Sequence, residues 1–224
     1  MTRRVLRGAT DMPAIILVSG IPRAGKSSLC DAIEASGAGF THVPLDRYVR
    51  PVPMSHAFLD WIADPACIDW PRLRSHLDIL RSDAACYSPR PDWENGWRGW
   101  RCEGGAIPRG PGRRMEPARS GYLIAGTHAF ALGAGMRVFV RTPDVVVAER
   151  LMGARLDAAG AYAVIRDRLA PNLAEIARGA ETAHLVIDGT ARRRTQLRHL
   201  LNAHARYLRS GGTEGVLHAA PLVP

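Results

Sequence analysis

The stretch Gly20-Ile21-Pro22-Arg23-Ala24-Gly25-Lys26-Ser27 decides how the rest of this sequence is interpreted. A glycine, four variable residues and then Gly-Lys-Ser form the spacing of a phosphate-binding loop, or P-loop. In such a loop the backbone amides and the lysine surround phosphate groups, and the serine hydroxyl reaches Mg²⁺. We therefore expect ATP and Mg²⁺ as cofactors, bound by Gly20, Ile21, Pro22, Arg23, Ala24, Gly25, Lys26, Ser27 and Ser28.

The segments on either side of this loop have the order that a P-loop requires. Residues 14–18 form a continuous apolar, β-branched run, which predicts a parallel strand buried on both faces. Residues 27–35 follow as a predicted helix, whose N-terminus would point at the phosphates. A glycine-rich turn without a ligand is the alternative, and the strand–loop–helix order argues against it.

Lys26 is the only lysine in the chain, and the other 29 of the 30 Lys and Arg residues are arginine. The single ammonium group therefore stands where phosphate binding requires a compact charge on a flexible stem. The formal charge of +9 argues only modestly for an anionic partner, since abundant Ala, Gly, Pro and Arg is typical of GC-rich coding. A nucleotide, a nucleic acid or a solvated surface would each account for it.

Composition narrows the class of protein. A chain of 224 residues with 46% hydrophobic residues suits one domain with its own core. No apolar run approaches the ~20 residues that span a bilayer, and no signal-peptide pattern follows Met1. The four cysteines are too widely spaced for a metal cluster, so we expect a cytoplasmic protein without disulfides or a membrane partner. Nothing in the sequence indicates an oligomeric state.

The apolar pattern predicts a three-layer α/β fold, the P-loop NTPase fold, with a five-stranded parallel sheet and an inserted substrate and lid region. The predicted strands cover residues 14–18, 41–45, 122–125, 137–140 and 184–188, and the helices 27–35, 55–82, 143–156, 162–177 and 191–208. We expect a single domain over residues 1–224. It has a core at 13–209, a Trp/Arg/Gly-rich arm at 86–121, a lid at 150–168 and a tail at 210–224.

Polar residues follow several of these strands directly. Asp46 comes after the second strand, residues 126–128 after the third, and Arg141 after the fourth. Ligands of parallel α/β sheets bind outside the carboxyl ends of the strands, so these residues should converge with the P-loop. The Asp46 carboxylate could accept the proton of a hydroxyl during phosphoryl transfer. Alternatively, Asp46 could have a purely structural role, as a cap of the strand or as the partner of an arginine.

Taken together, these segments resemble the uridine kinase and phosphoribulokinase-like branch of P-loop kinases over about residues 13–190. The similarity rests on the P-loop and on three weaker motifs. The motifs are Val43-Pro44-Leu45-Asp46-Arg47-Tyr48, Asp64-Pro65-Ala66-Cys67-Ile68-Asp69-Trp70 and Ser88-Pro89-Arg90-Pro91-Asp92-Trp93. Arg150, Arg155, Arg166 and Arg168 lie where the family carries a basic lid.

The resemblance implies transfer of the ATP γ-phosphoryl group to a hydroxyl of a nucleoside-like or related small molecule. It assigns catalytic roles to Asp46, Lys26, Arg150 and Arg155, and Mg²⁺ ligation to Ser27 and Asp46. The expected substrate residues are Tyr48, Asp92, Trp93, Trp97, Arg98, His128, Arg166 and Arg168. Instead of binding substrate, His128 could be a structural histidine at the start of a helix. The tryptophans could likewise anchor the arm to the domain instead of contacting a substrate.

The Ser88–Trp93 stretch has a spacing that differs from that of the family, and one further position departs from it. An acidic residue is expected before the glycine at the third strand end, where Ala125-Gly126 stands instead. Asp46 alone, Asp92 or Glu103 from the arm, or water could complete the Mg²⁺ shell, or catalysis could be lost. Three other functions therefore stay open: a kinase acting on a nucleic-acid hydroxyl, an antibiotic phosphotransferase, and a non-catalytic nucleotide-binding regulator.

Overall fold

A computed structural model of the chain describes residues 13–50, 55, 58–89, 112–152 and 178–212. The predicted leader, the centre of the arm, most of the lid and most of the tail therefore lie outside the described residues. The same holds for the site predictions at Asp92, Trp93, Trp97, Arg98, Arg155, Arg166 and Arg168, and for Glu103.

Five parallel strands form the central sheet, as predicted, in the order β2-β5-β1-β6-β7. The strands are β1 (Ala14–Ser19), β2 (Phe40–Pro44), β5 (Gly121–Ala125), β6 (Met136–Arg141) and β7 (Leu185–Asp188). The strand before the P-loop occupies the middle, and its Ile16, Leu17 and Val18 are fully buried. Its continuous apolar run is explained by burial on both faces.

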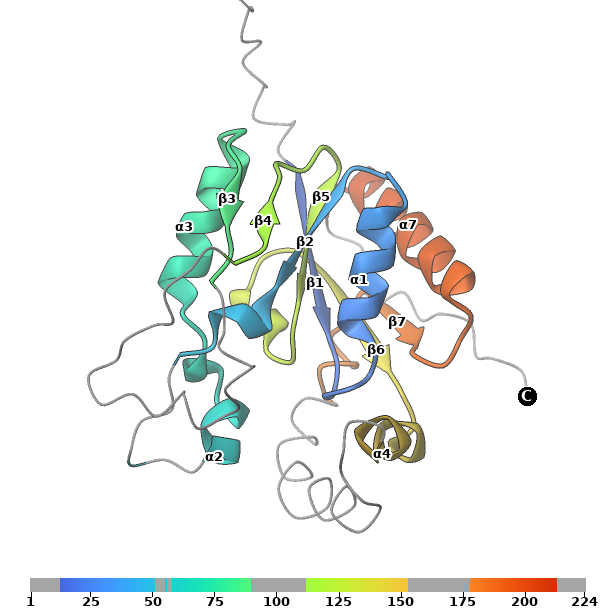
Figure 1. Cartoon of the computed structure of the whole chain (residues 1–224). Coiled ribbons are helices and arrows are strands. Elements are labelled where there is room, and N and C mark those ends of the chain that lie inside the picture. Colours follow the sequence, from blue (N-terminus) through green and yellow to red (C-terminus); the bar gives the residue numbers. More distant parts are fainter. Residues whose placement is uncertain (1–12, 51–54, 56–57, 90–111, 153–177, 213–224) are drawn as a thin grey trace, which may run out of the picture.

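Helices cover both faces of this sheet and complete three layers (Figure 1). On one face, α1 (Lys26–Ala35) and α7 (Arg193–Arg209) pack through Leu29 and Leu200. The helix α4 (Asp144–Met152) follows β6 and packs through Val147 into the same cluster as α1 and α7. On the other face, α3 (Trp70–Arg81) packs through Leu73 and Leu77. None of the helices in the described ranges has the length and apolar character needed to cross a bilayer.

The prediction of one continuous helix over residues 55–82 is wrong. The segment is divided into α2 (Phe58–Ala63), the 3₁₀ turn Pro65–Cys67 and α3. The side chain of Asp64 accepts the Ala66 N–H at 2.7 Å, and that of Asp69 accepts the Arg72 N–H at 3.2 Å. Asp64 directly precedes Pro65, and Asp69 precedes Pro71 by two residues. Each aspartate starts a new turn, because aspartate favours the N-cap and proline is accommodated in the first turn of a helix.

A short antiparallel ribbon, which was not predicted, lies inside the segment predicted as the arm. β3 (Cys86–Tyr87) pairs with β4 (Arg114–Met115), and buried Met115 joins the core beneath α3. Beyond the ribbon, Ser88 donates its N–H to the Arg113 carbonyl at 2.9 Å, and the Ser88 hydroxyl accepts the Arg113 N–H at 3.1 Å. Residues 88 and 113 thus meet at the base of the arm.

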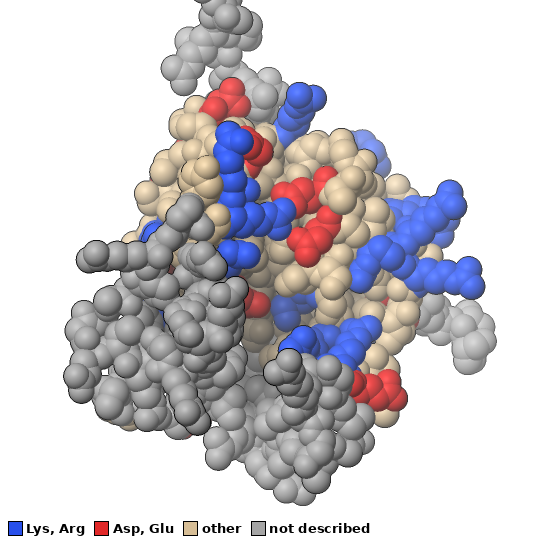
Figure 2. All heavy atoms as spheres, viewed as in Figure 1, with Lys and Arg blue, Asp and Glu red and all other residues tan. Residues whose placement is uncertain are grey.

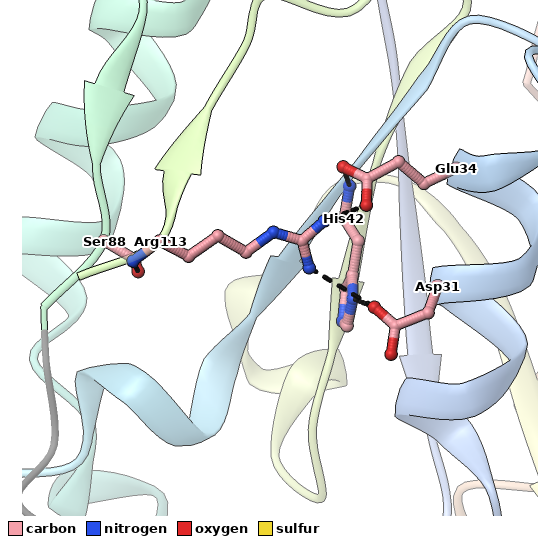
Figure 3. Close-up of polar contacts among 5 residues, drawn as sticks. All are labelled: Asp31, Glu34, His42, Ser88 and Arg113. Atoms are coloured by element: carbon pink, nitrogen blue, oxygen red, sulfur yellow. Dashed lines mark hydrogen bonds and ion pairs between the residues drawn. The ribbon is translucent and has the colours of Figure 1, made fainter.

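A charged cluster attaches this base to helix α1 (Figure 3). The Arg113 guanidinium pairs with Glu34 and donates to Asp31 Oδ1 at 3.3 Å. Buried His42 of β2 lies against the same carboxylates, with its Nδ1 2.8 Å from Asp31 Oδ1 and its backbone N–H donating to Glu34 Oε1 at 3.2 Å. The helix that begins in the P-loop is therefore linked to both β2 and the arm.

This cluster should contribute measurably to stability. The Arg113 and Glu34 side chains are only 32% and 27% exposed, so water screens their pairing less than that of a surface pair. We expect Glu34→Gln to lower the free energy of unfolding by about 1 kcal/mol, measured by urea denaturation. Arg114→Gln is the control, because its ion pair with Glu116 is more than half exposed and should matter less. Equal losses in the two variants would contradict this account.

Two buried histidines predict acid sensitivity. His204 of α7 is 6% exposed, packs edge-on against Phe40 at 5.2 Å, and has no hydrogen-bond partner for its Nε2. Burial lowers the pKa of His204, and burial also lowers that of His42 although Asp31 counteracts it.

Below pH ~6.5 the unfolded chain consequently binds more protons than the folded chain, and stability falls as the pH decreases further. We expect the urea midpoint to drop between pH 7.5 and 5.5. The drop should be smaller in His204→Leu, which removes one of the two groups. An unchanged pH dependence in that variant would show that His204 does not contribute.

Candidate functional site

The P-loop takes a backbone path that its glycines make possible. Gly25, just before α1, has a φ of 100° in the left-handed region, and a Cβ added at Gly20 would lie 2.5 Å from the Val140 carbonyl oxygen. Arg23 also has a positive φ of 62°, which is uncommon for a residue with a side chain. The loop is therefore a constrained turn pressed against β6, and the glycine spacing seen in the sequence follows from this path.

Lys26 is buried beneath the loop at 7% exposure. Its Nζ donates to the carbonyl oxygens of Gly20 at 3.0 Å and Ile21 at 2.8 Å. Burial lowers the pKa of Lys26, and the nearby negative charge of Asp46 opposes that shift. A bound phosphate would supply further negative charge to this ammonium group, so the residues present fit an anionic ligand.

Neighbouring segments hold the loop from outside. The Thr142 hydroxyl donates to the Ala24 carbonyl at 2.9 Å. Arg150 of α4 donates one guanidinium nitrogen to the Arg23 carbonyl at 3.0 Å and another to the Gly189 carbonyl at 3.1 Å. Arg150 thus contacts the P-loop, and the catalytic role predicted for it requires such a position.

Asp46 lies at the same edge of the sheet because of the strand register. Pro44 of β2 pairs with Ala125 of β5, which pairs with Val18 of β1. The P-loop and the 3₁₀ turn Leu45–Tyr48 therefore begin at equivalent heights, two strand spacings or about 10 Å apart. The Asp46 side chain is exposed, and its charge acts on Lys26. A carboxylate thus accompanies the phosphate-binding loop.

Two predicted substrate residues have other partners. Tyr48 is 1% exposed, and its hydroxyl lies 2.9 Å from Nδ1 of His76 on α3. His128 is half-buried, and its Nε2 donates to the Ile62 carbonyl of α2 at 2.8 Å. Tyr48 therefore anchors the turn that carries Asp46, and His128 holds α2 to the end of β5. Both contacts are structural, so neither residue enters the function proposed below as a substrate contact.

The end of β5 carries no acidic side chain. Ala125 is 2% exposed, and a Cβ added at Gly126 would lie 2.6 Å from Cβ of Leu45. Among the described residues no group of three or more His, Cys, Asp or Glu side chains could hold a metal. Ser27 and Asp46 are both exposed at this edge, and their oxygens suit Mg²⁺, which commonly completes its shell with phosphate and water.

The loop after β7 is a part of the site that was not predicted. A Cβ added at Gly189 would lie 1.9 Å from the Thr142 hydroxyl and 2.6 Å from the Ala24 carbonyl, so this loop packs directly on the P-loop. Asp188 fixes it by accepting the N–H and hydroxyl of Thr190 at 2.8 and 2.6 Å. A glycine at the end of the last predicted strand was the available signal.

Comparisons with known proteins agree with this geometry at the level of the fold. No family model and no curated protein sequence matches the chain. Among solved structures, it is similar to a protein provisionally named a fructose transport system kinase, from Silicibacter sp. TM1040. That match has 17% identity and a TM-score of 0.56, and covers 81% of this chain and 93% of the other.

A gluconokinase from Sinorhizobium meliloti 1021 also matches, at 18% identity over 89% of this chain and 95% of the other. The TM-score of that match is 0.41. The first match and the strand–P-loop–helix unit together lead to one conclusion: the chain has the α/β fold of a P-loop kinase.

Proposed function

We propose that this protein is an ATP-dependent kinase that transfers the γ-phosphoryl group to a hydroxyl of a small molecule. The observation that carries the proposal is the exposed Asp46 carboxylate at the strand edge that holds the P-loop and Lys26. Binding of a nucleotide needs only the loop. Transfer needs in addition a group that orients a hydroxyl and accepts its proton, and Asp46 is suited to that role.

The other residues of the site would stabilise charge. The loop amides and Lys26 would bind the phosphate oxygens, and Arg150, already at the loop through Arg23, would add a second cation. Mg²⁺, held by Ser27 and Asp46 with water, would neutralise charge on the transferred group. Asp46 would serve both metal and acceptor, because no carboxylate stands at Ala125.

The acceptor we propose is a small hydroxylated metabolite of the nucleoside or sugar class. The motifs around Asp46 and Asp64–Trp70 resemble those of uridine kinases and support a nucleoside. The sugar-related name of the structural neighbour supports a sugar. ATP consumption across a panel of nucleosides, sugars and sugar acids discriminates between the two, since an acceptor should raise turnover above the rate with water.

Lys26 should be required for nucleotide binding. At an ATP concentration 100-fold above Kd, binding stabilises a protein by about 2.7 kcal/mol, which corresponds to a rise in Tm of about 5–10 °C at this size. We expect Lys26→Met to lose most of that rise in a thermal shift assay, because the cation nearest the phosphates is removed. Arg74→Met, which removes an exposed cation on α3, should keep the full rise. A Lys26→Met protein that retained it would place ATP elsewhere.

Asp46 should matter far more for transfer than for nucleotide binding, because an asparagine oxygen can still reach Mg²⁺ and cannot accept the hydroxyl proton. We expect Asp46→Asn to lower acceptor-stimulated ATP consumption by about 10²-fold or more, since a general base contributes at least that much. The ATP-dependent rise in Tm should largely persist. Asp78→Asn, on exposed α3, is the matched control.

A nucleotide-binding regulator remains the second candidate, and the missing acid at Ala125 favours it. Its signature would be an ATP-dependent rise in Tm without turnover on any acceptor, and an Asp46→Asn variant that equals the parent in every assay.

A further inference from the structure

Helix α7 carries a one-sided stripe of positive charge. Over residues 193–209 the helix contains no aspartate or glutamate. Its buried face consists of Gln196, Leu200, Ala203 and His204. At 100° per residue Arg194, Arg198 and Arg209 lie opposite this face and Arg206 lies on its flank, and all four arginines are exposed. Figure 2 shows basic side chains gathered on the side of the molecule where α7 lies in Figure 1.

Within the described residues, no acidic side chain neutralises the stripe. None of these four arginines takes part in an ion pair or a hydrogen bond with another side chain in the part of the chain that the structure describes. Elsewhere, Arg113 is paired with Asp31 and Glu34, and Arg114 with Glu116. Arg194 and Arg198 are four residues apart and Arg206 and Arg209 three, so each pair repels itself on the helix surface. An anion bound between these arginines would reduce their mutual repulsion, so the surface is complementary to negative charge.

The stripe belongs to a different surface from the candidate kinase site. Arg193 at the start of the helix pairs with Gln196, and its pKa is lowered first by burial and then by the charge of Arg150. Arg193 therefore lies toward the P-loop. The four stripe arginines are exposed on α7, along a length of about 22 Å between Arg194 and Arg209.

The spacing within the stripe fits a duplex. Arg198 and Arg206 are eight residues apart, or about 12 Å along the helix axis, and the major groove of B-DNA is about 12 Å wide. An arginine pair could thus reach the phosphates on each side of the groove, with guanidinium geometry suited to phosphate oxygens. The exposed polar residues His199 and Asn202 lie between the pairs and could face base edges.

Other macromolecules fit this face less well. The one large exposed apolar side chain on α7 is Leu208, at the margin of the stripe. A helix that lies on a membrane needs a broad apolar face, and the centre of a protein interface needs apolar or aromatic residues. From the charge, the spacing and this polarity, we infer that the α7 stripe is a docking surface for the phosphate backbone of double-stranded nucleic acid.

The test is binding of the full chain to a fluorescent 20-base-pair DNA duplex, followed by anisotropy at several salt concentrations. The variant Arg194→Gln/Arg198→Gln/Arg206→Gln/Arg209→Gln should bind about tenfold or more weakly at 100 mM salt. Its slope of log K against log salt should be shallower by about 2–4, because each lost phosphate contact removes roughly 0.9. The fourfold Arg→Lys variant at the same positions should keep most of the affinity and most of the slope.

A charge-matched control separates this surface from the general basicity of the chain. The variant Arg74→Gln/Arg81→Gln/Arg114→Gln/Arg119→Gln removes four exposed arginines that are not part of α7 and should lose less than about threefold in affinity. The ATP-dependent rise in Tm should be the same in the parent and in the α7 variant. Loss of the duplex-binding inference would therefore leave the proposed kinase function intact, and loss of the kinase function would leave the duplex-binding inference intact.

Several results would overturn the inference. The first is that the parent chain does not bind the duplex. The second is that the α7 and control variants lose equal affinity for the duplex. The third is that the chain binds single-stranded DNA as tightly as the duplex. Tight, α7-dependent binding to phosphatidylserine vesicles with weak duplex binding would assign the stripe to a membrane surface instead.

Discussion

The buried ammonium of Lys26 is the constraint on which the candidate site depends. At 7% exposure, with two loop carbonyls as its hydrogen-bond partners, it is a desolvated charge that favours a nearby anion. Asp46 lies close enough to act on it, and a bound phosphate would do so more strongly. The glycines that permit the tight loop and the central strand that presents it both serve to place this one charge.

The surrounding fold makes that placement rigid. The loop is pressed against β6 through Gly20, held through its carbonyls by Thr142 and Arg150, and contacted by the loop at Gly189. Polar groups held by several elements reorganise little when charge develops near them, which is how a site stabilises a phosphoryl transition state. The site is therefore composite, with residues that are far apart in the sequence and adjacent at one edge of the sheet.

Much of this arrangement could be predicted from sequence, because its determinants are local and periodic. The apolar run at 14–18 and the glycine spacing after it indicated the strand, the loop and the helix. The prediction was wrong where the outcome depends on tertiary contacts. Two-residue strands such as β3 and β4 leave no periodicity to detect. The hydrogen bond between Tyr48 and His76 of another helix was likewise outside the prediction. Chain-distant hydrogen bonds of this kind have no signature within a short window.

The way in which the arm is fastened has a consequence for how the chain can vary. Residues 88 and 113 are joined by hydrogen bonds on the outer side of a ribbon, and Arg113 ties that junction to α1. Because the two ends are fixed together, the entropic cost of lengthening the segment between them grows only slowly with its length. The arm could therefore be exchanged for one of different length or composition without moving a strand of the sheet. Such a junction would let this segment diverge in sequence while the phosphate loop stays unchanged.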